Sequence, residues 1–156
     1  MKKKYNKYNK LLTSKSLPTW DLTDLYQSIS SKKIFIDLNY IEKSSKSFAK
    51  KYEGKISKLN PKDLFNAILN LENIDEKMDK ILSYAHLLVA ENADHEKNKI
   101  FFQQMQEKIT NYSSFLIFFT LELNQIDEKR LYTLLKDKNL SEYKTWIKNR
   151  RTFKPY

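Results

Sequence analysis

The scarcity of helix-breaking residues is the feature that most constrains how this chain can fold. One Gly and three Pro in 156 residues leave few positions where a helix is made to end or bend. After Pro61 the apolar residues recur three or four positions apart, at Leu64, Ile68, Leu71, Ile74, Met78, Ile81, Ala85 and Leu88. This spacing places them on one face of an amphipathic helix. The sequence therefore predicts an all-α fold.

A second apolar stripe follows with the same helical spacing. Its members are Phe102, Met105, Ile109, Tyr112, Leu116, Phe119, Leu123 and Ile126. We expect Asp94 to cap one continuous helix of roughly 45 Å here. The short connection at 92–94 predicts that the two helices form a long antiparallel hairpin. Residues 115–119 are apolar on all sides, so other helices of this chain or a partner must cover them.

Capping residues predict the remaining helix boundaries. Ser30 or Ser31 can cap a helix that ends near Tyr52, with Gly54 at its C-terminal stop. Asn60, followed by proline, is the typical start of the next helix.

Towards the C-terminus we expect two shorter helices. Asp127 would cap the first, which ends near Lys136, and Ser141 would cap the second, which ends near Arg151. At the other end, residues 20–26 form a turn-rich segment that anchors aromatic side chains on the body. The prediction is about five helices in a single domain over residues 17–156.

The net charge of +10 is concentrated at the N-terminus. Residues 1–16 contain six Lys and no acidic residue, and we expect them to form a disordered basic tail. Only three of the 29 basic residues are Arg, the residue that reads bases and phosphates bidentately. We therefore expect no specific nucleic-acid partner, although the Lys- and Tyr-rich tail leaves this open as a weaker alternative.

Composition also excludes several classes of chemistry. Without Cys the chain has no disulfide, thiolate nucleophile or Cys-based zinc site, and a single Gly almost rules out a phosphate-binding loop. The longest apolar run, residues 115–119, is far shorter than the ~20 residues of a membrane span. No apolar signal segment follows the N-terminus. We expect a cytoplasmic protein with no membrane partner.

The strongest candidate for chemistry is the pair His95 and Glu96. It begins like HExxH, in which two His one helical turn apart bind zinc and the Glu acts as a base. Lys99 occupies the second ligand position, and the only other His, His86, lies beyond the hairpin connection. We therefore predict no catalytic and no metal-binding residue, with His86 on a helix face. Substrate-binding residues are unknown.

Two other clusters have simpler interpretations than catalysis. Asp75, Glu76 and Asp79 alternate with Lys77 and Lys80, which indicates a solvated helix face with local ion pairs. The aromatic residues could stack on bases or line a peptide groove, but their helical spacing favours the core. They are Phe101, Phe102, Phe115, Phe118 and Phe119.

Four phrases occur in a fixed order along the chain. They are Leu17-Pro18-Thr19-Trp20-Asp21-Leu22-Thr23-Asp24-Leu25-Tyr26, Phe48-Ala49-Lys50-Lys51-Tyr52-Glu53-Gly54-Lys55, Phe118-Phe119-Thr120-Leu121-Glu122-Leu123-Asn124 and Arg150-Arg151-Thr152-Phe153-Lys154-Pro155-Tyr156. Together with residues 83–88, 104–109 and 123–127, their order resembles the N-terminal region of the oligoendopeptidase F family. These are zinc metallopeptidases related to thimet oligopeptidase.

The resemblance implies an all-helical N-terminal lobe that closes over a peptide channel in a cytoplasmic enzyme. In the family, HExxH and a further Glu bind zinc in a separate catalytic lobe, and these have no counterpart here. By resemblance the chain is a lobe or fragment without cofactor and inactive alone, whose partner is a catalytic chain or a peptide. The alternative is an independent, non-enzymatic helical protein that binds a peptide or protein partner.

Overall fold

The computed structural model describes residues 20–151. This range contains α-helices and one 3₁₀ helix, and no β-strand. The prediction of an all-α fold is confirmed. The basic tail at residues 1–16 and the end of the fourth phrase, residues 152–156, lie outside the described residues.

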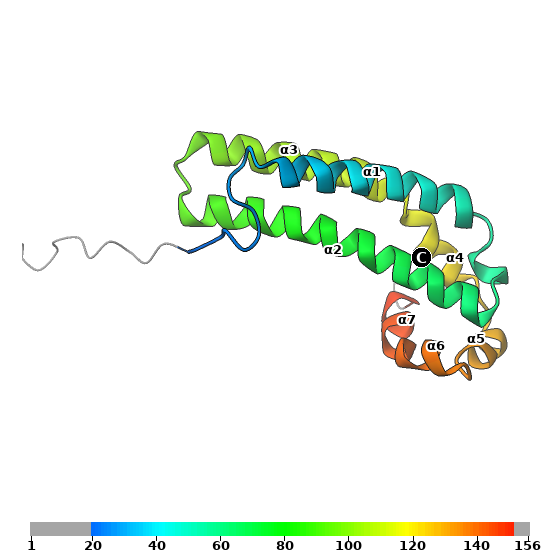
Figure 1. The fold of residues 1–156 in the computed structure, drawn as a ribbon. Helices are drawn as coiled ribbons and strands as arrows, with labels where there is room; N and C mark the ends of the chain where they lie inside the picture. Colours follow the sequence, from blue (N-terminus) through cyan, green and yellow to red (C-terminus); the bar gives the residue numbers. More distant parts are fainter. Residues whose placement is uncertain (1–19, 152–156) are drawn as a thin grey trace, which may run out of the picture.

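Three long helices form a bundle: α1 (Lys32–Tyr52), α2 (Pro61–Glu91) and α3 (Glu96–Ser114). Helix α2 returns along α1, and α3 runs back beside both (Figure 1). A connection at residues 92–95 joins α2 to α3, so the predicted antiparallel hairpin is confirmed.

The predicted stripe of α2 lies in the core. Its first seven members are at most 4% exposed, and Leu88 at the end is half-buried. The second stripe is also buried from Met105 to Ile126, apart from Tyr112, which is half-buried like Phe102 at its start. These two stripes and the inner face of α1 form one continuous core.

The predicted starts of the first two long helices are confirmed. The Ser31 hydroxyl accepts a hydrogen bond from the Lys33 amide at 3.4 Å, and the Asn60 side chain accepts from the Asp63 amide at 2.9 Å. Gly54 has φ = +77°, a left-handed conformation that costs other L-residues roughly 1–2 kcal/mol. It lets the chain leave α1 and enter the 3₁₀ helix η1 (Ile56–Lys58).

Four short helices follow the bundle: α4 (Ile117–Asn124), α5 (Glu128–Leu134), α6 (Lys138–Glu142) and α7 (Lys144–Arg151). We call residues 117–151 the C-terminal cap. The cap folds against the end of the bundle formed by η1 and the first half of α2 (Figure 1). The described residues thus contain seven α-helices, where the sequence suggested about five.

The predicted 45 Å helix is wrong, because the chain breaks between α3 and α4. The amides of Phe115 and Leu116 bond to carbonyls three residues back, at Tyr112 and Ser113, instead of four. Just before this point the hydroxyls of Ser113 and Ser114 donate to backbone carbonyls of their own helix. Such bonds compete with regular helix geometry. The apolar spacing continues through the break and so conceals it.

Two predicted N-cap residues are also wrong. Residue His95, not Asp94, occupies the N-cap position of α3 and makes no side-chain cap bond. Asp137 caps α6, because its Oδ1 accepts from the amides of Asn139 and Leu140, whereas Ser141 donates to a carbonyl inside that helix. The predicted cap of α5 is confirmed, with Asp127 accepting from the Arg130 amide at 2.8 Å, although α5 ends at Leu134.

Residues 20–31 lead into α1 and anchor on the bundle through one of their two aromatic residues. Tyr26 is 2% exposed and packs edge-on against Tyr84 of α2 at 5.2 Å between ring centroids, whereas Trp20 is 55% exposed. No helix within residues 20–151 is both long enough and apolar enough to cross a membrane.

Candidate functional site

The HExxH-like pair lies at the exposed start of α3. His95 precedes the first turn, Glu96 is in it, and both side chains are exposed, as is Lys99 one turn later. His86 lies across the hairpin on α2, where its ring packs edge-on against Phe102 at 6.0 Å. Within residues 20–151 no three His, Cys, Asp or Glu side chains are grouped closely enough to hold a metal ion.

The prediction of a solvated acidic face with local ion pairs on α2 is wrong for Asp75, whereas Glu76 and Asp79 are exposed as predicted. Asp75 pairs with Arg150 of α7 at 3.1 Å, and Lys77 pairs with Asp37 of α1 at 2.9 Å. Burial raises the pKa of Asp75 despite the charge of Arg150. The spacing within α2 suggested i,i+4 partners, but both pairs join α2 to other helices and help to orient them.

A buried polar network links the N-terminal segment to the bundle. Asp37 is 5% exposed and accepts hydrogen bonds from the Tyr26 hydroxyl and the Lys77 ammonium, each at 2.9 Å. Burial alone would raise the pKa of Asp37, but these two bonds, with the charges of Lys77 and Lys80, bring it below its usual value. Burial, followed by the bond to Asp37, raises the pKa of Tyr26.

Sequence reasoning missed this network, although a signal was present. Asp37 lies three residues after Ile34 and four before Ile41, in register with the buried face of α1. A carboxylate at such a position needs a buried partner. Its partners come from a segment 11 residues before it and from a helix 40 residues after it, so the sequence pattern alone could not name them.

The apolar stretch at residues 115–119 is only partly covered. Phe119 is fully buried between Phe48 and Trp146, with ring centroids at 5.9 and 6.3 Å. By contrast, Phe115 is 39% exposed and Ile117 is 59% exposed. Leu121, one turn after Ile117 on α4, is 46% exposed. We call the exposed side chains of Phe115, Ile117 and Leu121 the apolar corner.

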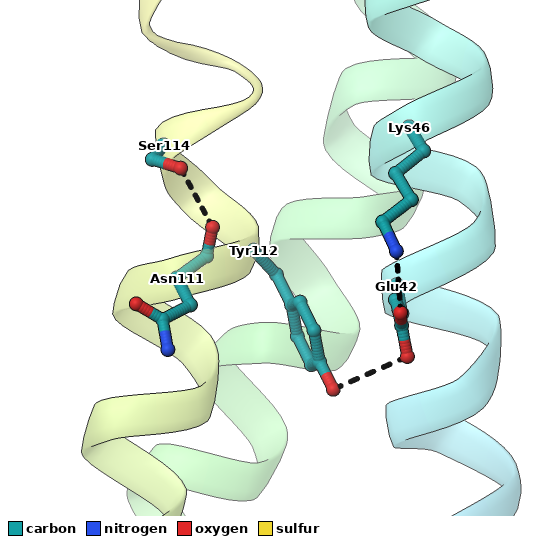
Figure 2. A network of polar contacts seen from close by, with 5 residues as sticks. All are labelled: Glu42, Lys46, Asn111, Tyr112 and Ser114. Atoms are coloured by element: carbon teal, nitrogen blue, oxygen red, sulfur yellow. Dashed lines mark hydrogen bonds and ion pairs between the residues drawn. The ribbon is translucent and has the colours of Figure 1, made fainter.

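A polar network joins α1 to α3 (Figure 2) and touches the apolar corner at Phe115. The Tyr112 hydroxyl donates to the Glu42 carboxylate at 3.4 Å, and Lys46 pairs with the other oxygen of Glu42 at 2.6 Å. The Lys46 ammonium also lies 5.9 Å from the centre of the Phe115 ring. Exposed apolar side chains with a polar rim are a typical arrangement of protein interaction surfaces.

All three arginines make internal contacts. Arg130 donates to the carbonyls of Ser57 and Leu59, at 2.8 and 3.0 Å, and so fastens α5 to η1 and the residue that follows it. Arg151 donates to the Ile126 carbonyl at 2.7 Å. Arg150 stacks on the Trp146 ring at 4.5 Å while it pairs with α2. Arg151 thus holds the cap together, and Arg130 and Arg150 join it to the bundle.

Three of the four phrases contribute to the contact between bundle and cap. Glu122 of the third phrase accepts hydrogen bonds from the amide of Gly54 in the second phrase, at 2.6 Å, and from that of Ile56 just after it, at 2.9 Å. Arg150 of the fourth phrase pairs with Asp75 of α2 at 3.1 Å. These phrase residues have structural roles in this contact.

No model of a known protein family matches the chain, and no curated protein or solved structure matches it significantly. The resemblance to oligoendopeptidase F therefore depends on the ordered phrases alone and stays a prediction.

Proposed function

We propose that this chain is a non-catalytic helical lobe of the oligoendopeptidase F type. It covers the peptide channel of a zinc metallopeptidase whose HExxH motif lies in a different polypeptide segment. The ordered phrases suggest this parent, and the all-helical fold is compatible with it. The observation that carries the proposal is the apolar corner, which is exposed within residues 20–151.

The apolar corner has the physical character of a docking surface. Burying each of its three side chains against a partner would contribute roughly 1.5–3 kcal/mol if the side chain were fully exposed beforehand. Their exposures of 39%, 59% and 46% leave part of that energy available. The polar rim of Glu42 and Lys46 would give the docked partner a defined orientation.

The first test concerns the catalytic partner itself. We expect DNA next to this gene to encode a segment with HExxH and a downstream Glu. When that segment is co-expressed with the chain, the two should co-elute on size exclusion, and only the complex should cleave a fluorogenic peptide in a chelator-sensitive way. A purified chain that binds stoichiometric zinc and cleaves the peptide alone would overturn the proposal, as would the absence of any such coding segment.

The second test locates the docking surface. The double variant Ile117→Glu/Leu121→Glu should abolish co-elution, because it places two charges in an apolar contact. Tyr132→Glu on α5, where the side chain is 69% exposed, is the matched control and should co-elute like the unmodified chain. If both variants co-elute with the catalytic segment equally well, the apolar corner is not part of the interface.

One observation favours the second candidate, an independent helical interaction protein. The buried side chains of bundle and cap form one continuous core, as expected of a chain that folds without a partner. This candidate predicts a monomeric, cooperatively folding chain with no catalytic partner encoded nearby. Its ligand would bind elsewhere on the bundle.

A further inference from the structure

A groove of about 360 Å³ runs between α1 and α2 and is separate from the apolar corner. Its floor is aromatic and aliphatic: Phe48 and Tyr52 are each 4% exposed, and Ile74 is 2% exposed. Residues on one face of α1 and a single residue of α2 form its rim. They are Tyr40, Lys43, Ser44, Ser47, Lys51 and Asn70.

Contacts between the two helices fix the shape of the groove at both ends. At one end the Asn70 side chain donates to the Tyr52 hydroxyl at 3.3 Å. At the other end Lys77 lies 5.2 Å from the centre of the Tyr40 ring while it pairs with the buried Asp37. A groove held open in this way loses little conformational entropy when a ligand binds.

The groove is cationic. Its lining contains Lys43 and Lys51 and, among the described residues, no carboxylate. Lys51 lies over the Tyr52 ring at 4.8 Å, and the contact with Tyr52 raises the pKa of Lys51. Hydroxyl and amide groups of Ser44, Ser47 and Asn70 add donors and acceptors along the rim.

The dimensions of the groove favour an elongated ligand. Tyr40 and Tyr52 are twelve positions apart on α1, which corresponds to roughly 18 Å, and the two lysines are roughly 12 Å apart along the helix. An extended peptide advances about 3.3 Å per residue, so five or six residues fill the groove. Two acidic side chains four residues apart on such a peptide would match the two lysines. A small anion could reach only one.

We propose that the groove between α1 and α2 binds an extended acidic peptide, with apolar side chains on its floor and carboxylates at Lys43 and Lys51. This peptide site adds a ligand to the proposed function. It rests on that function in one respect, namely that the chain is part of a peptide-binding enzyme. It concerns a different surface from the one that docks the catalytic segment. The isolated chain therefore suffices to test it.

The experiment is fluorescence anisotropy with a labelled eight-residue peptide that carries glutamates at its second and sixth positions and apolar residues between them. The isolated chain should bind it saturably at about 0.1 M salt, where surface charges are partly screened. A peptide with lysines in place of both glutamates should bind at least about tenfold more weakly. If the acidic peptide shows no saturable binding, the proposal is wrong.

Matched variants separate the groove from general charge attraction. Lys43→Ala/Lys51→Ala should weaken binding of the acidic peptide by about tenfold or more, and Lys32→Ala/Lys50→Ala by less than about twofold. The control removes two exposed charges from the same helix outside the groove. Equal losses in both double variants would overturn the proposal.

A single-stranded RNA oligonucleotide of similar length is the competing ligand. Stronger binding of the RNA than of the acidic peptide, lost in the groove variant and kept in the control, would assign the groove to nucleic acid and also overturn the proposal. Circular dichroism of all variants should be unchanged, since the four lysines are exposed. Failure of these peptide tests leaves the docking proposal intact, because the apolar corner carries that proposal.

Discussion

The three-helix bundle and the C-terminal cap are stabilised in different ways. Each bundle helix has 19 residues or more, whereas no cap helix exceeds eight. The bundle helices bury long apolar stripes against one another. Each cap helix adds only one or two buried apolar residues to the same core. The cap therefore depends also on individual contacts across large sequence distances, such as Glu122 with Gly54 and Arg150 with Asp75.

This difference reflects how helices are stabilised. An isolated helix shorter than about 12 residues is marginal in water, so every cap helix needs tertiary contacts to form. A long amphipathic helix gains enough from its buried face to tolerate local irregularities. We therefore expect single substitutions at the contact between cap and bundle to have large effects on stability. Substitutions at the ends of individual helices within the cap should have small effects.

The largest effect is expected for Phe119→Ala. Phe119 is fully buried and touches Phe48 of the bundle and Trp146 of the cap, so its removal should lower the free energy of unfolding by about 3–5 kcal/mol. Urea titrations would measure this loss, with the fluorescence of Trp146 reporting on the cap in a Trp20→Phe background. Phe115→Ala, which removes a half-exposed ring, is the control and should cost far less. Similar losses would show that the cap does not depend on this contact.

A smaller effect is expected for Asp37→Asn, which acts inside the bundle. Loss of charge-assisted bonds to a buried group should cost about 1.5–3 kcal/mol at pH 7. The folded state lowers the pKa of Asp37, so its ionisation stabilises the protein above the unfolded pKa of about 3.9. That stabilisation is lost as the pH falls through the lower folded-state pKa.

Urea titrations from pH 7 to pH 3 would measure this dependence. The difference between Asp37→Asn and the unmodified chain should shrink at the acidic end. Asp79→Asn, on the exposed side of α2, should change stability little at any pH. A constant difference across the whole range would contradict the role of the Asp37 charge.

Glu122→Gln should cost about 1–3 kcal/mol, because a neutral amide oxygen replaces the carboxylate that accepts from Gly54 and Ile56. Thermal unfolding followed by circular dichroism would detect the loss. Glu107→Gln makes the same chemical change at an exposed position of α3. If the two variants unfold alike, the Glu122 contact contributes nothing measurable.

The smallest effects on stability concern the start of helix α6 within the C-terminal cap. Asp137→Ala removes the cap of α6 and should cost about 1 kcal/mol. Ser141→Ala removes a hydroxyl that only donates within the helix and should change stability by less than about 0.5 kcal/mol. The reverse order would favour the helix boundary predicted from the sequence.

The sequence predicted only those features of the candidate site that a short stretch of residues reveals by itself. It identified the HExxH-like pair at His95 and the apolar character of residues 115–119. Which of those apolar residues remain exposed depended on how α4 leaves α3, and this break leaves no trace in the apolar spacing. The groove between α1 and α2 was missed because its lining combines residues from two helices.

By itself the sequence determined the all-helical class, the α2–α3 hairpin and the starts of α1, α2 and α5. These features follow from apolar spacing and from capping side chains within a few residues. Only the tertiary structure decided the break at Phe115, the division between α6 and α7, and the partners of Asp37, Asp75 and Glu122. Each of these depends on contacts between residues distant in sequence or on competing local hydrogen bonds, whose balance the apolar pattern does not encode.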